Sequence, residues 1–237
     1  MVNVSVIIPT LNEEGYIEKT LSSLEKQLEK GDEIILVDSY SKDNTVKTAK
    51  RFGARVVYIG RCGIGPAKTF GAKHAKNKII AMLDADGVPA PDWLSRIKRQ
   101  FEDETVNMIT GIDPFESPNL SRKLLYGVFT RIFFELGRFS YKTKRIAFMS
   151  VNNCAIRKDV FLKYGGLRNV VCEDLDFGHR AKGLEGVIYD DKLIVTLSDR
   201  RFKKEGVIRV ILTWFKADIA ILRSKKIAAA TDYAVTR

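Results

Sequence analysis

Residues 79–86 read Ile-Ile-Ala-Met-Leu-Asp-Ala-Asp, and this stretch decides the fold. Its apolar run indicates a strand buried on both faces, as in parallel sheets. Two carboxylates, Asp84 and Asp86, follow the strand two residues apart. Ligands of open α/β sheets bind beyond the carboxyl ends of the strands. Because Mg²⁺ is usually held by one or two carboxylates and by substrate phosphates, the stretch suits a divalent cation and a phosphate-bearing ligand.

Strands and helices alternate around this stretch. Strands are predicted at 4–8, 33–37, 55–59, 78–83 and 106–112. Helices are predicted between them, at about 13–28, 44–52, 67–75 and 91–101. This alternation predicts an α/β fold with an open, mostly parallel twisted sheet and helices on both faces. No repeat or low-complexity linker interrupts the chain, so we predict one domain with two functional halves, 1–118 and 119–237.

The second half has a less regular pattern. A long apolar helix is predicted at 120–139, then a short strand at 154–156 and helices that begin at Lys158 and Glu173. Strands at 187–189 and 193–197 follow, and a basic amphipathic helix is predicted at about 206–223.

Composition limits the class of protein. The chain has 237 residues, 45% of them hydrophobic, which is ordinary for a globular protein. Neither a secretory signal nor an apolar run of bilayer length is visible. Three cysteines without C-x-x-C spacing favour reduced thiols over disulfides or structural zinc. We therefore expect a cytoplasmic protein.

The net charge of +11 is unevenly placed. Residues 1–118 hold 16 basic and 17 acidic side chains, whereas residues 119–237 hold 24 and 12. The excess predicts that the second half meets an anionic partner, such as phosphates, an acidic membrane surface or nucleic acid. A merely solvated basic surface is the alternative.

Several acidic and glycine-rich segments are candidate site elements. Asp38 ends the second strand and should converge with Asp84 and Asp86 if the sheet is parallel; the alternative is helix capping or turn formation. The glycines at 60–65 match neither the dinucleotide fingerprint nor the P-loop. Three carboxylates within residues 173–176 favour a helix start, and one of them could act as a general base.

Four of these segments together resemble glycosyltransferase family 2, the inverting enzymes with the GT-A fold. The resemblance rests on residues 4–14 (VSVIIPTLNEE), residues 35–45 (ILVDSYSKDNT), Asp84-Ala85-Asp86 and Glu173-Asp174, and it covers roughly residues 3–200. It implies a Rossmann-like half that binds a nucleotide sugar, here 1–118, and an acceptor-binding half, here 119–237. These four motifs specify the family but not the substrate.

The resemblance also implies roles for individual residues. Asp174 matches the catalytic base, with Glu173 beside it, and Asp86 matches the ligand of Mg²⁺ or Mn²⁺. The residues expected at the nucleotide sugar are Pro9, Thr10, Asn12, Glu13, Asp38, Lys68, Asp84 and Asp86. Those expected on the acceptor or diphosphate side are Asn153, Arg180, Arg200 and Arg201.

Two departures from the family pattern qualify this expectation. No Q-x-x-R-W pattern follows the acidic pair, which argues against a processive polysaccharide synthase. Residues 198–201 (SDRR) stand where many relatives place a histidine on the diphosphate side, and arginines could bind diphosphate there.

We therefore expect a metal-dependent, non-processive, inverting hexosyl transfer from a UDP- or GDP-linked sugar to an acceptor hydroxyl on a glycan or a lipid-linked molecule. The alternatives are a nucleotidyltransferase and a basic nucleic-acid-binding module, although the aromatics fall at core spacing rather than between basic residues. A nucleic-acid partner is not expected.

The apolar stripes of the second half leave two interpretations open. Basic residues beside Phe, Leu and Trp suit a helix at an anionic membrane surface, which would place the enzyme peripherally on the inner face of the membrane. The same stripes could bury against the sheet or a second subunit, as in a homodimer.

Overall fold

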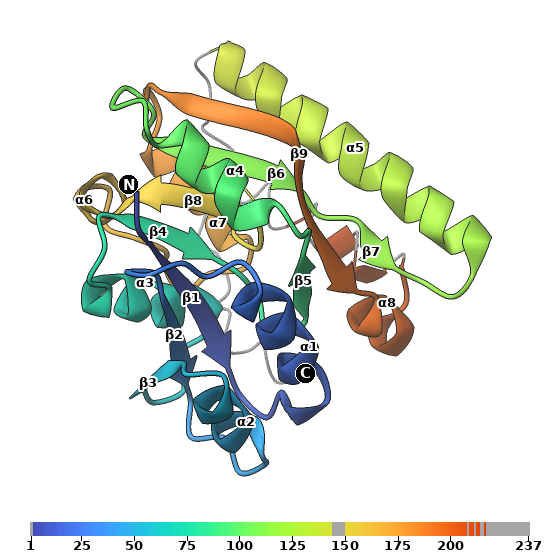
Figure 1. Cartoon of the computed structure of the whole chain (residues 1–237). Helices are drawn as coiled ribbons and strands as arrows, with labels where there is room; N and C mark the ends of the chain where they lie inside the picture. The colour runs from blue at the N-terminus through green and yellow to red at the C-terminus, as the bar shows by residue number, and fades with distance from the viewer. Residues whose placement is uncertain (1, 144–149, 208, 211, 214–215, 217–237) are drawn as a thin grey trace.

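A mixed β-sheet runs through the centre of the molecule (Figure 1). The structure is a computed structural model that describes residues 2–143, 150–207, 209–210, 212–213 and 216. Within these residues the sheet order is β3-β2-β1-β4-β8-β6-β9-β5, and β7 pairs with β9. The strands are β1 (Val4–Thr10), β2 (Glu33–Asp38), β3 (Arg55–Tyr58), β4 (Ile79–Met82), β5 (Gly87–Pro89), β6 (Met108–Ile112), β7 (Phe115–Glu116), β8 (Cys154–Arg157) and β9 (Val187–Ser198). The helices are α1 (Glu14–Glu25), α2 (Thr45–Arg51), α3 (Ile64–His74), α4 (Trp93–Gln100), α5 (Leu120–Lys142), α6 (Lys158–Lys163), α7 (Glu173–Arg180) and α8 (Arg200–Glu205).

The first half of the chain forms the expected parallel sheet. β3, β2, β1 and β4 pair side by side in parallel. Ile7 lies opposite Ile35 of β2 and Met82 of β4, so the carboxyl ends of these strands share one edge. The predicted α/β class, with an open and mostly parallel sheet, is confirmed in this part of the molecule.

The strands after β4 complete the sheet with mixed pairing. β8 inserts between β4 and β6 and is antiparallel to both, so β6 runs in the same direction as β4. β9 is parallel to β6, and β5 is antiparallel to β9. The two strands predicted at 187–189 and 193–197 are one continuous strand, with a register shift in its pairing with β6. The short strands β5 and β7 were not predicted because only their pairing with β9 defines them.

Alternating side chains of the strands build two cores, one on each face of the sheet. Val6 and Ile8 of β1 face a cluster that includes Leu21 of α1 and Trp93 of α4. Ile7, which lies between them in β1, faces the other cluster, made with residues of α3, α6 and α7. Figure 1 shows α1, α2 and α4 in front of the sheet and α3 behind it.

Close packing fixes α3 against the sheet. A Cβ added to Gly71 would lie 2.5 Å from Cγ2 of Ile7 and 2.8 Å from Cγ2 of Val37, so only glycine allows this approach. The helix thereby holds Lys68, one turn earlier, above the carboxyl half of β4.

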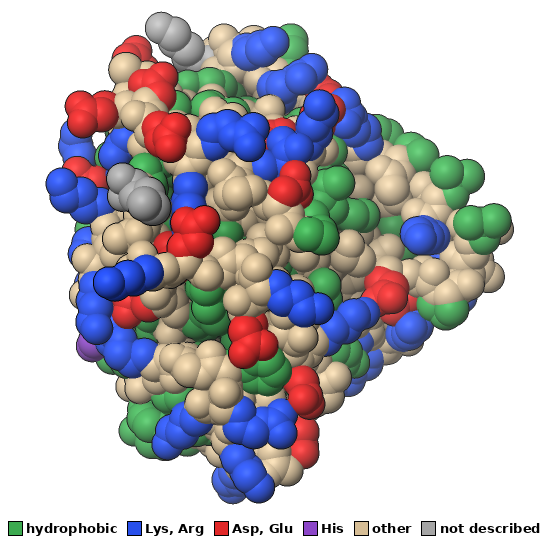
Figure 2. Space-filling model, viewed as in Figure 1, with side chains coloured by type: hydrophobic (Ala, Val, Ile, Leu, Met, Phe, Trp, Pro, Cys, Tyr) green, Lys and Arg blue, Asp and Glu red, His purple; other side chains and the backbone are tan. Residues whose placement is uncertain are grey.

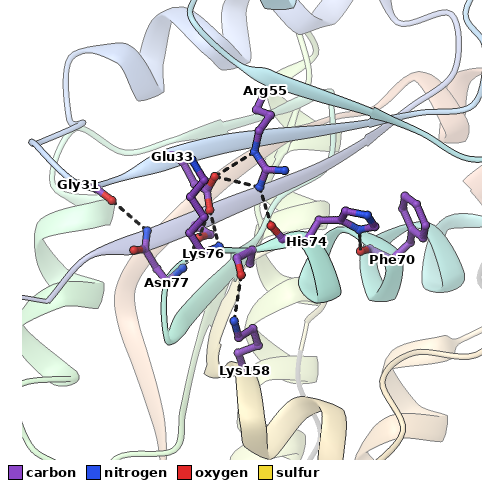
Figure 3. Close-up of polar contacts among 10 residues, drawn as sticks. Gly31, Glu33, Arg55, Phe70, His74, Lys76, Asn77 and Lys158 are labelled. Atoms are coloured by element: carbon purple, nitrogen blue, oxygen red, sulfur yellow. Dashed lines mark hydrogen bonds and ion pairs between the residues drawn. The ribbon is translucent and has the colours of Figure 1, made fainter.

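A polar network ties the end of α3 to the opposite, amino-terminal edge of the sheet (Figure 3). Glu33 accepts hydrogen bonds from the Arg55 guanidinium at 3.0 Å and from the Lys76 backbone N–H at 2.7 Å. Arg55 also donates to the His74 carbonyl, and Lys158 donates to the Ala75 carbonyl at 2.9 Å. Burial alone would raise the pKa of the Glu33 carboxyl, but these hydrogen bonds and the Arg55 charge lower it.

The long helix α5 lies along β6 and β7, and its outer face is exposed (Figure 1). None of the helices described here is long and apolar enough to cross a membrane. The basic helix predicted at about 206–223 lies mostly outside the described residues. The structure adds α8 just before it, which was not predicted.

Candidate active site

The first site element is the shared carboxyl edge of β1, β2 and β4. Thr10, the last residue of β1, lies opposite Asp38, the last residue of β2. The segment Asp84–Asp86 continues from β4, which is parallel to β1. The strand-end carboxylates therefore converge, as a parallel sheet requires.

Asp38 is fully buried and held in place by its neighbours. Its carboxylate accepts from Thr10 Oγ1 at 3.0 Å, from the Ser41 backbone N–H at 2.8 Å and from Ser41 Oγ at 2.5 Å. Asn12, with a φ of 55°, donates its backbone N–H to Ser41 Oγ, and its side-chain oxygen accepts from the Lys42 N–H. The loops after β1 and β2, with Pro9 and Thr10 at their base, thus form one rigid unit.

Lys68 and Asp84 form an ion pair at this edge of the sheet. Lys68 is fully buried, and its Nζ lies 2.8 Å from Oδ1 of Asp84 and 2.6 Å from the Val151 carbonyl oxygen. The Asn152 amide, with its nitrogen toward Asp84, donates to the same carboxylate at 2.8 Å. Lys68 therefore links α3, β4 and the segment before β8, and its contact with a nucleotide stays a prediction.

Asp86 and Glu13 share one cation, Arg200. Arg200 bonds both carboxylate oxygens of Glu13, at 2.6 and 3.0 Å, and its Nε lies 2.9 Å from Oδ2 of Asp86. Burial alone would lower the pKa of this guanidinium, but the two carboxylates outweigh that effect and raise the pKa above its ordinary value. Residues 13, 86 and 200 thus meet at the sheet edge although they are far apart in the sequence.

Arg201 turns to another partner. Its Nε lies 3.3 Å from Glu205, one turn later in α8. Its role on the diphosphate side remains a prediction.

The acidic helix start lies near the same edge. Cys172, in the left-handed conformation with φ 60°, precedes α7, and the Asp174 carboxylate accepts from the Leu175 N–H at 2.8 Å. Burial raises the pKa of the Cys154 thiol to about 12; the charges of Asp113 and Asp174 add to this effect, and that of Lys68 opposes it. Thr69, next to Lys68 in α3, donates to the Leu167 carbonyl at 3.0 Å, so the loop before α7 packs against the helix that holds Lys68.

Two residues predicted on the acceptor or diphosphate side make contacts within the fold. Asn153 is fully buried; its amide nitrogen donates to the Leu193 carbonyl at 2.8 Å, and its oxygen accepts from the Trp93 indole at 2.8 Å. Arg180 pairs with Asp176 at 2.9 Å and donates to the Gly166 carbonyl at 2.6 Å. These contacts position β8 and the loop before α7, and nothing in them tests a contact with substrate.

The sequence analysis missed Asp113. It follows β6, which runs in the same direction as β4, so it lies at the same edge. It accepts a short hydrogen bond from Ser150 Oγ. Burial and the Asp84 charge raise the pKa of the Asp113 carboxyl to about 7, although the Ser150 bond and the Lys68 charge act against this. Its position directly after the predicted strand 106–112 was the available signal.

The carboxylates at this edge suit a metal ion whose coordination shell is completed by a substrate. Among the residues that the structure describes, no three or more His, Cys, Asp or Glu side chains form a cage for an ion. Asp86 can instead provide one oxygen ligand and leave the remaining positions to phosphate oxygens, which is how Mg²⁺ is commonly bound. The donor set thus fits a hard divalent cation bound together with a diphosphate.

The fold is that of known glycosyltransferases. A mannosyltransferase from Pyrobaculum calidifontis, in complex with GDP-Man and Mn²⁺, aligns with a TM-score of 0.65 at 20% identity, over 98% of this chain and 67% of that one. Glucosyl-3-phosphoglycerate synthase from Mycobacterium tuberculosis, in complex with Mn²⁺, UDP and glucosyl-3-phosphoglycerate, gives 0.64 at 20% identity, over 94% and 79%. The GT-A architecture expected from the sequence is confirmed.

Sequence comparison identifies the family. An uncharacterised glycosyltransferase of Mycobacterium bovis is 33% identical over 108 residues, which cover 46% of this chain. That match spans 47% of the relative, about half its length. The sequence model of glycosyl transferase family 2 matches residues 5–165, more than half of the chain. The chain therefore belongs to glycosyl transferase family 2.

Proposed function

We propose that this chain transfers a hexosyl group from a nucleoside diphosphate sugar to an acceptor hydroxyl, with inversion and without processivity. The observation that carries the proposal is the convergence of Asp38, Asp84 and Asp86 at one sheet edge. Asp174 lies at the start of α7, and the loop before α7 packs against α3. The related folds that bind GDP-Man or UDP together with Mn²⁺ support it.

Each element has a distinct task in this proposal. The rigid loops around Asp38 receive the nucleoside, because the remaining acceptor capacity of a carboxylate suits ribose hydroxyls or a base N–H. Asp86 holds the divalent cation, which when bound neutralises charge on the leaving diphosphate. Lys68 fixes the orientation of Asp84 beside it.

Asp174 acts as the general base. It removes the proton of the acceptor hydroxyl while that oxygen bonds to the anomeric carbon from the face opposite the diphosphate. The bond between the anomeric carbon and the diphosphate oxygen breaks with its electrons on the diphosphate. The Asp174 carboxylate accepts a hydrogen bond from the Leu175 N–H at 2.8 Å, which orients it at the start of α7.

Ligand-induced thermal stabilisation tests the proposal. UDP or GDP with Mn²⁺ should raise the melting temperature, because a ligand at a hundred times its Kd stabilises the folded state by about 2.7 kcal/mol. An oligonucleotide should not, and a shift with oligonucleotide alone would favour the nucleic-acid-binding alternative. A screen of nucleoside diphosphate sugars for slow hydrolysis then identifies the sugar donor. If no nucleoside diphosphate stabilises the protein with Mn²⁺, the proposal is wrong.

The outer face of α5 supports a second, finer proposal, in which the enzyme binds an anionic membrane surface and a lipid-linked acceptor. Large apolar side chains are exposed along this face: Leu120 by 81%, Leu124 by 69% and Phe139 by 65%. Figure 2 shows hydrophobic and basic side chains side by side at the exposed end of this helix, on the right of the view. Such a mixture suits an interfacial helix at anionic lipid.

Vesicle flotation tests this second proposal. The protein should float with vesicles of phosphatidylglycerol and phosphatidylcholine at low salt, less so as salt rises, and not with phosphatidylcholine alone. The double variant Leu124→Ser/Val128→Ser should lose flotation, whereas Tyr58→Ser, an exposed aromatic on β3, should retain it. Absence of flotation with anionic vesicles at low salt would contradict membrane binding. The exposed apolar side chains of α5 would then be explained by burial against a partner protein.

A further inference from the structure

Arg200 occupies the position between two carboxylates that a metal ion would otherwise neutralise. Glu13 is only 3% exposed and is itself fixed, because its backbone N–H donates to Thr45 Oγ1 at 2.7 Å. The guanidinium is bidentate on Glu13, reaches Asp86 with Nε, and stacks 4.4 Å from the centre of the Tyr16 ring. Glu13 and Tyr16 therefore anchor Arg200, and its Nε lies 2.9 Å from Oδ2 of Asp86.

The charges at this position favour a divalent cation only when a diphosphate accompanies it. Glu13, Asp86 and Arg200 together carry one net negative charge, and Asp84 is already neutralised by Lys68. A divalent cation on Asp86 alone would face the guanidinium at short range and leave the group positively charged. The two negative charges of a sugar-linked diphosphate would restore the original balance.

We propose that Arg200 makes metal binding conditional on the diphosphate of the sugar donor. Without the diphosphate, Arg200 holds Asp86 and excludes the divalent cation. With it, the guanidinium keeps Glu13, releases Asp86 to the metal and donates to the phosphate oxygens, a contact for which its planar fork is suited. This inference rests on the proposed function, because it assumes that the substrate carries a diphosphate.

The first claim is that Arg200 excludes the divalent cation when no diphosphate is bound. It is tested by titrating the protein with Mn²⁺ alone and measuring the free ion by electron paramagnetic resonance. Arg200→Gln should bind Mn²⁺ alone about tenfold more tightly than the wild-type protein, because the ion no longer competes with a charge-assisted hydrogen bond. The control is Lys204→Gln, which removes one positive charge from an exposed position of the same helix and should leave the affinity for Mn²⁺ unchanged.

The second claim is that Arg200 donates to the phosphate oxygens once the diphosphate is bound, and titration with nucleotide tests it. In the presence of saturating Mn²⁺, Arg200→Gln should bind UDP or GDP, whichever the wild-type protein binds, about tenfold more weakly. The two changes have opposite signs, whereas a merely structural role of Arg200 would weaken both. An unchanged or weaker affinity for Mn²⁺ alone in Arg200→Gln overturns the inference.

Loss of Arg200 leaves the buried Glu13 charge without this partner, so the variant could unfold. The double variant Glu13→Gln/Arg200→Gln removes both charges and keeps Asp86, and it should show the same tighter binding of Mn²⁺ alone. If the wild-type protein binds neither nucleotide with Mn²⁺, the proposed function fails, and so does the diphosphate step. If it binds one of them and the variants bind Mn²⁺ alone no better, only the role of Arg200 fails.

Discussion

Replacement of Asp113 by asparagine should change the pH dependence of stability. The Asp113 carboxyl has a pKa of about 7 in the folded protein, against 3.8 as its ordinary value, chiefly because of burial. The folded state therefore binds more protons than the unfolded state between these values, so stability falls as pH rises from about 4 to about 7. The amide of the Asp113→Asn variant has no such proton to lose, and its oxygen can still accept from Ser150.

The size of the effect follows from the two pKa values. A difference of about 3 units corresponds to about 4 kcal/mol when it is fully developed. Between pH 5 and pH 8 it amounts to at most about 3 kcal/mol, since part of the difference lies below pH 5. It is an upper value because the surroundings of a buried carboxylate can rearrange to stabilise its charge.

Urea denaturation at pH 5 and pH 8, followed by fluorescence, measures this. Trp93 is fully buried in the core, so its fluorescence changes when unfolding exposes the indole to water. The free energy of unfolding of Asp113→Asn minus that of the wild-type protein should become more positive as pH rises. The exposed Glu104→Gln variant controls for the loss of a charge. A difference between Asp113→Asn and wild type that stays constant from pH 5 to pH 8 would refute the reasoning.

Three further predictions concern chemistry and packing. Asp174→Asn should lower kcat by about 10²- to 10⁴-fold with little change in nucleotide affinity, because the base acts only in the chemical step; near-normal kcat would contradict its assignment. Gly111→Ala should lower the free energy of unfolding by at least about 1–3 kcal/mol, because its Cβ would lie 2.0 Å from the Leu193 carbonyl oxygen. The control Gly127→Ala, whose Cβ would have nothing within 4 Å, should be neutral or stabilising. Equal melting temperatures of the two variants would argue against the close approach at Gly111. Glu33→Gln should be less stable than wild type at neutral pH and approach it as pH falls below the carboxyl's ordinary pKa of 4.5, since a lowered pKa contributes stability that acid removes; a gap that persists at low pH would contradict this.

Local patterns predicted the parallel part of the sheet well. β2 and β4 are built on continuous apolar runs, and the carboxylates that follow these runs, Asp38 and Asp84, mark the site. Because neighbouring parallel strands end at one edge, position in the sequence was enough to predict that these side chains meet. The same rule, applied to the fifth strand, would have included Asp113.

Contacts between distant segments could not be predicted in this way. The insertion of β8 between β4 and β6 depends on pairing across some 70 residues of chain, which no local pattern encodes. Arg200 was predicted on the acceptor or diphosphate side, but only the structure shows that it joins Glu13 and Asp86. Likewise, Asn153 was predicted near the acceptor, whereas its hydrogen bonds to Trp93 and Leu193 can be seen only in the folded chain.

The late arrival of β8 has a consequence for how the chain matures on the ribosome. The four strands β3, β2, β1 and β4 all lie within the first 82 residues and can pair as soon as they emerge. β5 and β6 emerge next, but β8 and β9, the strands with which they pair in the sheet, follow only after α5 has been made. Until then the outer edge of β4 lacks its native neighbour, and such an edge can pair with other chains. Synthesis therefore makes the four parallel strands first, and the strand that closes their open edge later.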